Sequence, residues 1–288
     1  MKEIKEQLKQ NRYIYSFVKK VKRCYRYSIS VYGEEIVFYI KCILKKFKIV
    51  KTDKYVETLK NKYQGEKIFI VATGPSLKVE DLELLKRNNA ITISMNGVFK
   101  LYDKTDWRPA YYVADDYWLI KKYAEIYPDI DYSSLSICGA VMGYKTKKYV
   151  NASNKDRIGY VEVNYFDHWW THYSKRFKYN KDIRYGNYDC YTVTNFAINI
   201  ADYMGAKEIY LLGVDCNYSS SLKHAGEQET NVTEEELKNA KATETGMING
   251  YKAINKYIDK KVKVYNATRG GELEVFTRIT LEEAIADM

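Results

Sequence analysis

The sequence predicts an α/β fold in which a mostly parallel sheet carries helices on both of its faces. Short apolar segments of strand-forming residues alternate with segments that have helical spacing. The strand-like segments are apolar almost throughout, as expected for a parallel sheet that is covered on both faces. Residues 67–77 (KIFIVATGPSL) begin this pattern, because an apolar run ends at Gly74 and a helical pattern starts at about Val79.

The other elements follow along the chain. Strands are expected at 90–95 (AITISM), 110–114, 135–138, 158–163, 208–213 (EIYLLG) and 262–265. Helices are expected at 193–204, 243–256 and 281–286. The segment at about 164–189 has no clear period and is rich in aromatic and polar residues, which predicts a lid or substrate loop inserted in the domain.

The positive charge lies at the N-terminus. The first 62 residues contain 17 basic and 6 acidic side chains, whereas the remainder contains 30 and 31, so the whole net charge of +10 belongs to this segment. We therefore expect two parts: a basic, amphipathic helical arm over residues 1–64 and a nucleotide-binding catalytic domain over residues 65–288. Residues 64–66 are expected to form the hinge between them.

Residues 36–50 of the arm combine large apolar side chains with lysines, which fits the surface of an anionic membrane. The apolar run is too short to span a bilayer and residues 1–10 are too polar for a signal peptide. The alternatives are a solvated helix packed on the domain, or a dimerisation helix that would make the protein a homo-oligomer. Nucleic acid is not expected as a partner, because residues 63–288 are close to neutral and no recognition motif is visible.

The five cysteines are odd in number and show no CxxC spacing. We interpret them as reduced thiols of a cytoplasmic protein, peripheral on the inner membrane face if the arm binds lipid. No zinc site is predicted from them, and no metal is expected to be required.

The turn after the first strand is a candidate nucleotide site, formed by Thr73, Gly74, Pro75 and Ser76. Gly74 lacks the Cβ that would hold a phosphate or ribose away from the backbone. Ser76 is expected to cap the following helix, whose free N–H groups favour anions. An ordinary strand-to-helix turn stays an alternative, because neither the Walker pattern nor GxGxxG is present.

Polar residues also follow three further strands, at the sheet edge where ligands bind in open α/β folds. Asn96 and Gly97 follow the second strand, and the Asn96 amide can both donate and accept towards a base or ribose. Asp115 and Asp116 follow the third strand and suggest either a ribose contact or a Mg²⁺ ligand. Asp215 follows the strand at 208–213. Turn chemistry is the alternative for each.

Histidine is the usual general base near neutral pH, and the chain has three. His224, in the polar segment after Asp215, is the first candidate, with a solvent-exposed loop residue as the alternative. His168 is the second candidate, and with Trp169 and Trp170 it suits a sugar-stacking substrate loop. Arg269, beside two glycines, is a candidate phosphate ligand or the partner of a surface acid.

Four segments carry a resemblance to known families: TGPSL (73–77), SMNG (94–97), YMGAKEIYLLGVDCNYS (203–219) and VYNATRGGELEVFTRITLEE (264–283). They resemble a bacterial and archaeal family with a hydroxymethylpterin diphosphokinase-like domain, whose bacterial members occur among polysaccharide-assembly and flagellin-glycosylation proteins. Without the last segment, they also resemble the bacterial sialyltransferases that use CMP-sialic acid. The resemblance implies a Rossmann-like domain with Gly74, Ser76 and Asn96 around the nucleotide.

The sialyltransferase likeness further implies that Tyr188 or Tyr191 holds the phosphate. The sequence departs from that pattern because no histidine precedes the helix at 243–256, so His224 or an acid such as Asp215 or Glu244 would have to serve as the base. The expected function is a metal-independent glycosyltransferase of cell-surface polysaccharide assembly, which moves a sugar from a nucleotide-activated donor, CMP-sugar-like above all, to a glycan or lipid-linked acceptor. The alternatives are an ATP- and Mg²⁺-dependent pyrophosphokinase and a non-catalytic nucleotide-binding scaffold.

Overall fold

The centre of the protein is a six-stranded sheet in which every neighbouring pair of strands is parallel. The computed structural model describes residues 20, 32–115, 117–126, 138–140, 157–164, 178–217, 233–286 and 288. The strands of the sheet are β1 (Lys67–Val71), β2 (Ile91–Met95), β3 (Tyr111–Val113), β7 (Glu208–Leu212), β8 (Lys263–Asn266) and β9 (Thr277–Arg278). The predicted α/β fold class is confirmed.

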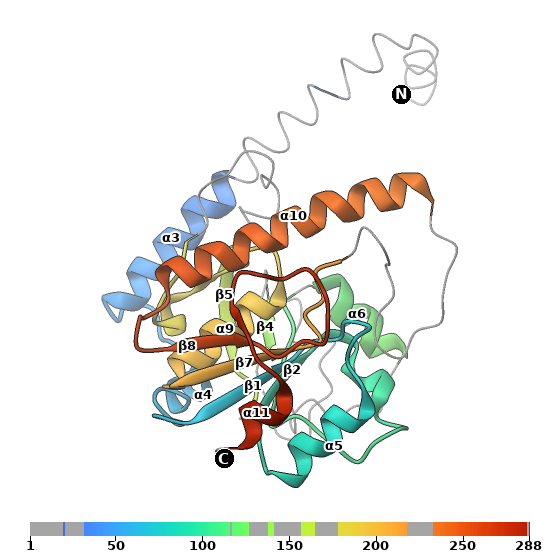
Figure 1. Cartoon of the computed structure of the whole chain (residues 1–288). Coiled ribbons are helices and arrows are strands. Elements are labelled where there is room, and N and C mark those ends of the chain that lie inside the picture. The colour runs from blue at the N-terminus through green and yellow to red at the C-terminus, as the bar shows by residue number, and fades with distance from the viewer. Residues whose placement is uncertain are drawn as a thin grey trace, which may run out of the picture.

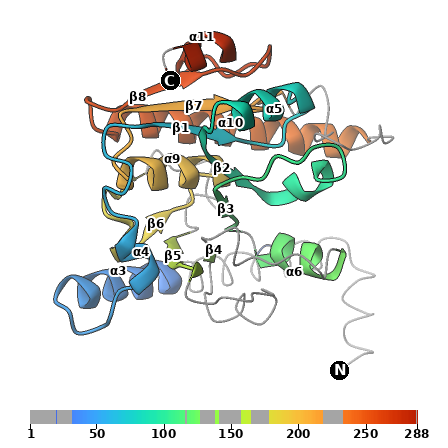
Figure 2. The ribbon, with the colours of Figure 1, turned by 90° about the horizontal axis from the view of Figure 1, so that it is seen from below.

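The strand order is β3-β2-β1-β7-β8-β9, which Figure 2 shows running from β8 down to β3. The chain builds outward from β1 through β2 to β3, and later returns to the other side of β1 with β7. Ile70 of β1 is accordingly paired with Ile93 on one side and Leu211 on the other. This reversal beside β1 is the place where open α/β sheets bind their ligands.

Helices cover both faces of the sheet, because successive residues of a strand point to opposite faces. On one face Ile68 and Ile70 pack in a core with α9 (Val193–Tyr203) and α10 (Glu234–Tyr257). On the other face Phe69 and Val71 pack with α5 (Val79–Arg87) and α11 (Leu281–Ala286). Figure 1 shows α9 and α10 above the sheet and α5 and α11 below it. The helix η2 (Asn96–Leu101) and α6 (Tyr117–Ile126) follow β2 and β3.

A second, three-stranded parallel sheet contains β4 (Cys138–Ala140), β5 (Tyr160–Asn164) and β6 (Asn187–Tyr188). The short helix η5 (Ile183–Tyr185) leads into β6. Figure 2 places this sheet next to β3, with α3 (Tyr32–Lys46) on its outer side. No helix in the described part of the chain has both the length and the apolarity to span a bilayer.

The chain around residues 64–66, the expected hinge, is hydrogen-bonded to the domain. The division into an arm and a catalytic domain stays a prediction. The backbone N–H groups of Asn61, Tyr63 and Gly65 donate to the carbonyls of residues 203–205, at the C-terminal end of α9, at 2.8–3.1 Å. Just before them, α4 (Lys54–Thr58) is capped by Asp53. Val56 and Leu59 are fully buried in the same core as β1. Buried apolar side chains therefore join this part of the arm to the sheet.

The segment expected to be a lid or substrate loop, at about 164–189, is described at residue 164 and at residues 178–189. Residues 178–182 contain no helix or strand, whereas residue 164 ends β5, and η5 and β6 lie within residues 183–188. The role as a lid stays a prediction. Ile183, Asn187 and Asp189 are buried, and β6 adds two residues to the small sheet. Residues 165–177 lie outside the described part of the chain. The helix expected at 243–256 is longer than predicted, since α10 begins at Glu234.

Candidate functional site

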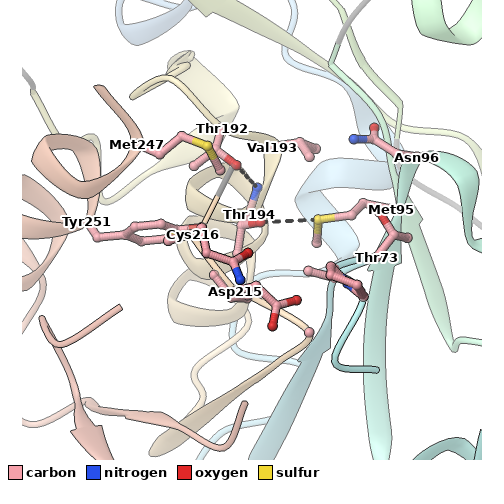
Figure 3. Close-up of a pocket in the computed structure, with 16 residues that line it drawn as sticks. Thr73, Met95, Asn96, Thr192, Val193, Thr194, Asp215, Cys216, Met247 and Tyr251 are labelled. Carbon is pink, nitrogen blue, oxygen red and sulfur yellow. Dashed lines mark hydrogen bonds between the residues drawn. The ribbon is translucent and has the colours of Figure 1, made fainter. Parts of the chain in front are cut away.

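A pocket opens at the carboxyl ends of β1, β2 and β7, at the reversal of strand order, and encloses about 520 Å³ including the solvent at its mouth. Figure 3 shows Met247 and Tyr251 of α10 on one side and Thr73 and Asn96 on the other, with Asp215 between them. The lining residues are Ala72–Pro75, Met95, Asn96, Thr192–Thr194, Gly213–Asn217, Met247 and Tyr251.

Gly74 brings the turns after β1 and β7 into direct contact. Its N–H donates to the carbonyl oxygen of Gly213 at 2.9 Å. A Cβ at position 74 would lie 2.4 Å from that oxygen and 1.9 Å from the Asp215 carboxylate. The absent side chain thus makes room for the β7 turn, which is a different reason for glycine from the ligand approach that the sequence suggested.

Asp215 is the acidic residue of the lining, and it is only 6% exposed. Within the described chain, its carboxylate accepts a hydrogen bond from the Ser76 N–H at 3.3 Å. Its carbonyl accepts from the Glu272 N–H at 2.7 Å, and Gly271 packs against its backbone. The carboxylate therefore stands at a fixed position in the pocket.

The N-terminus of α9 forms another wall. Thr192 is its N-cap, with the hydroxyl accepting from the Thr194 N–H at 3.3 Å, and no acidic residue lies in the first turn. The Thr194 hydroxyl donates to the sulfur of Met95 at 3.4 Å, as Figure 3 shows. Free N–H groups and the helix dipole give such a terminus a partial positive charge that favours anions. This is the main positive feature of a lining that contains no Lys or Arg among the described residues.

Two glycines allow α10 to close the pocket against the turn before α9. A Cβ at Gly250 would lie 2.1 Å from the carbonyl oxygen of Cys190, and one at Gly246 would lie 2.9 Å from the Tyr191 ring. Cys190 and Tyr191 both have left-handed backbone conformations, with φ of 46° and 71°. Such conformations are uncommon away from glycine, and they often occur at functional sites.

The buried atoms Asn96 Oδ1 and Ser76 Oγ are near the pocket and have no hydrogen-bond partner in the described part of the chain. Asn96 lines the pocket in a left-handed conformation with φ of 49°. Because an unpaired buried polar atom is costly, a ligand that donates to it would be favoured.

Cys216 also lines the pocket, but it is not a ready nucleophile. Burial, together with the negative charges of Asp215, Glu244 and Glu272, raises the pKa of its thiol to about 12. The thiolate is the reactive form of cysteine, so Cys216 stays a protonated wall residue at neutral pH.

The structure brings together five of the predicted site residues. Thr73, Gly74, Pro75, Asn96 and Asp215 line the pocket, whereas Ser76, Gly97 and Asp115 are not part of its lining. The expected Ser76 cap is wrong: α5 begins two residues later at the N-cap Lys78, whose N–H donates to Asp81 at 3.1 Å. The predicted residues Asp116, His168, Trp169, Trp170 and His224 lie outside the described part of the chain.

The candidate phosphate ligands lie elsewhere. Tyr188 is in β6, where its ring meets Phe38 edge-to-face and burial raises the pKa of its hydroxyl. Tyr191 stands beside Gly246. Arg269 pairs with the buried Asp81, and this hydrogen bond raises the pKa of its guanidinium. The described residues contain no group of three or more His, Cys, Asp or Glu side chains suited to a metal ion.

Sequence reasoning missed the α9 and α10 walls. Thr192 stands directly before an apolar helical run, which is the ordinary signature of an N-cap and the signal that was available. Met247 and Tyr251 have helical spacing that is indistinguishable from that of core residues. Only the fold shows that they reach a pocket.

The sheet order and the pocket at its reversal define a Rossmann-like α/β protein with a candidate ligand site at the switch point. Residues 41–221 match the family described as 6-hydroxymethylpterin diphosphokinase MptE-like. Because this match spans more than half of the sequence, the chain belongs to that family, as predicted. The likeness to sialyltransferases stays a prediction.

Comparison with solved structures finds a likeness to the MAf glycosyltransferase from Magnetospirillum magneticum AMB-1. The TM-score is 0.47 at 14% sequence identity, covering 77% of this chain and 35% of that one, so the chain spans about a third of that protein's length. No curated protein matches the sequence significantly.

Proposed function

We propose that the protein is a glycosyltransferase that binds a nucleotide-activated sugar in this pocket and transfers the sugar to a glycan acceptor. One observation carries the proposal: the N-terminus of α9 and the buried carboxylate of Asp215 line the same pocket, at the reversal of the strand order. The first turn of α9 contains no acidic residue. An anion-binding element and a fixed acid then line the same pocket, an arrangement suited to stabilising the leaving nucleotide and to taking the acceptor's proton.

The donor's phosphate would lie on the first turn of α9, with the Thr192 hydroxyl and the free N–H groups around it. The nucleoside would extend towards residues 73–75 and Asn96. The Asn96 Oδ1, which has no partner among the described residues, can accept from a base or ribose. Met247 and Tyr251 supply an apolar surface for the sugar or base.

In the reaction, the acceptor's hydroxyl oxygen attacks the anomeric carbon and the bond from that carbon to the phosphate oxygen breaks. The electron pair stays on the departing nucleotide, where the α9 N-terminus stabilises the charge. The acceptor's proton passes to a base, for which Asp215 and His224 are the two candidates. We expect transfer to need no metal cofactor.

The first experiment is a thermal-shift panel of CMP, CDP, UDP, GDP, ADP and ATP, each with Mg²⁺ and with EDTA. A ligand at about 100 times its dissociation constant adds about 2.7 kcal/mol of stability. Stabilisation by CMP or a nucleoside diphosphate in EDTA supports the proposal and names the donor class. Stabilisation by none of them would overturn it.

A turnover assay then follows nucleotide release from the matching sugar donor. Asp215→Asn should retain nucleotide binding, since the amide oxygen can still accept from Ser76, but a lost base lowers turnover by about 10²-fold or more. His224→Ala tests the other candidate in the same way. Asp103→Asn, an exposed acid outside the lining, is the matched control and should behave as wild type. Wild-type turnover in both Asp215→Asn and His224→Ala would dismiss both bases.

The name of the family favours one second candidate, a pyrophosphokinase that transfers diphosphate from ATP to a hydroxymethyl group. Asp115, buried at the end of β3, or Asp116 would then hold Mg²⁺. Stabilisation by ATP only with Mg²⁺, and EDTA-sensitive consumption of ATP, would favour this reaction. Binding without any turnover would instead favour a nucleotide-binding scaffold.

A further inference from the structure

The exposed apolar side chains of the described chain are concentrated in one short segment. Among the residues that the structure describes, seven of the ten exposed large hydrophobic side chains lie between residues 36 and 50. They are Ile36, Val37, Ile40, Ile43, Phe47, Ile49 and Val50, and we refer to them as the α3 apolar face. Phe47 and Ile49 are 74% and 71% exposed. An apolar surface of this kind on a folded protein marks an interaction site.

A surface helix normally packs its apolar stripe against the domain, but α3 packs with a different side. Its buried side chains are Phe38 and Lys45, and the half-buried Cys42 lies on the same side. A Cβ at Gly186 would lie 2.7 Å from the Phe38 ring and 3.0 Å from the Cys42 sulfur, so this side meets the chain before β6. The apolar stripe, at positions 36, 40, 43 and 47, faces away from the protein.

The chain after α3 holds the end of the apolar face in place. Lys48 adopts a left-handed conformation with φ of 60°, and the Ile49 N–H donates to the Leu44 carbonyl at 2.9 Å while the Lys48 N–H donates to Lys45 at 3.0 Å. This is the Schellman arrangement, which normally buries the apolar residue after the turn. Here Ile49 points into solvent instead.

The charge around the apolar face selects its partner. Residues 36–51 contain five lysines and no acidic residue, and Lys46, Lys48 and Lys51 are exposed beside the face. A second copy docked through the same face would bring these lysines against their own counterparts. Anionic lipid headgroups would neutralise them while the acyl chains receive the apolar side chains.

We propose that the α3 apolar face docks the protein on an anionic bilayer, with α3 lying in the interface and Lys46, Lys48 and Lys51 at the headgroups. The helix of 15 residues is suited to lying on a membrane rather than crossing it. Figure 2 shows α3 at the periphery of the molecule, beside β5 and β6.

The test is sedimentation of the full chain with sucrose-loaded vesicles, either phosphatidylcholine alone or phosphatidylcholine with a quarter phosphatidylglycerol. Wild type should bind the anionic vesicles more tightly than the neutral ones. The double variant Ile43→Ser, Phe47→Ser should lower the partition coefficient by about a hundredfold or more. The binding free energy from each inserted side chain scales with the number of carbons that it buries in the membrane. Lys46→Gln with Lys48→Gln should lower it about fivefold per lysine on anionic vesicles only.

The matched control is Ile126→Ser with Tyr257→Ser, which removes two exposed apolar side chains from α6 and α10 and should bind as wild type. Equal binding by wild type and the Ile43/Phe47 variant would overturn the proposal, as would no binding by wild type. Light scattering on the same samples identifies self-association. If the wild type is a dimer that does not bind vesicles, and the Ile43/Phe47 variant is a monomer, the face belongs to contact with a second copy.

Discussion

Replacing Gly74 with alanine tests how the pocket floor is built. The new Cβ would lie 2.4 Å from the Gly213 carbonyl oxygen, whereas ordinary contacts to a Cβ are 3.4–4 Å, so the two turns must separate by about 1 Å. Overpacking of this kind costs roughly 1–3 kcal/mol, and the hydrogen bond from Gly74 to the same carbonyl is worth about 1 kcal/mol. The expected loss of unfolding free energy is therefore about 2–4 kcal/mol.

The assay is thermal unfolding of the purified variant, in which this loss corresponds to a fall in Tm of about 3–7 °C for a chain of 288 residues. Gly97→Ala is the matched control, because its nearest neighbour is the far end of the Tyr123 side chain, at 2.7 Å, which can move. It should lose less than about 1 kcal/mol. A Gly74→Ala variant that melts within about a degree of wild type would refute the reasoning.

Three further predictions concern the surroundings of the pocket. Gly250→Ala should lower the unfolding free energy by about 1–3 kcal/mol in chemical denaturation, because its Cβ would meet the Cys190 carbonyl oxygen. Alanine is the better helix former, so a gain in stability would contradict the close contact. Asp202→Asn should stabilise the protein, and the gain should grow from about pH 4 to pH 7. Burial raises the folded-state pKa of Asp202, so the stability of the wild type falls as the pH rises through that pKa. The asparagine does not titrate, and its amide oxygen can still accept from the Tyr179 hydroxyl. Equal Tm differences at both pH values would exclude this explanation. Cys216, with its pKa raised to about 12, should stay unlabelled by iodoacetamide at about pH 8 until the protein is denatured, which mass spectrometry of the labelled peptides would check.

The sequence predicted the central strands well because their signal is local. The runs KIFIV and AITISM become β1 and β2, and the helix expected at 193–204 becomes α9 with a difference of one residue. The strands that it missed, β6 and β9, have two residues each, too few to show a period. The packing of Val56 and Leu59 was not predictable in the same way, because both lie in a basic segment of the sequence although both are buried against the sheet.

The site residues that could be predicted from the sequence are those that come just after a predicted strand. Asn96 and Asp215 stand just past β2 and β7, so the rule for strand ends placed them at the pocket. The fit of Gly250 against Cys190 joins residues that are 60 positions apart, and no local pattern encodes it. Ser76 failed as a cap because Asp81 reaches back to Lys78 and starts the helix later.

The contacts of Gly246 and Gly250 also bear on how the pocket can change in evolution. Where a helix rests on side chains, its distance from a neighbour changes with every substitution in between. Here α10 contacts the backbone carbonyl of Cys190 at Gly250. A substitution of the Cys190 side chain does not change this contact between α10 and the turn. The width of the pocket is therefore fixed by main chain. Accommodation of a larger or smaller ligand falls to the side chains at Met247 and Tyr251, so these two positions are where relatives with different ligands should differ.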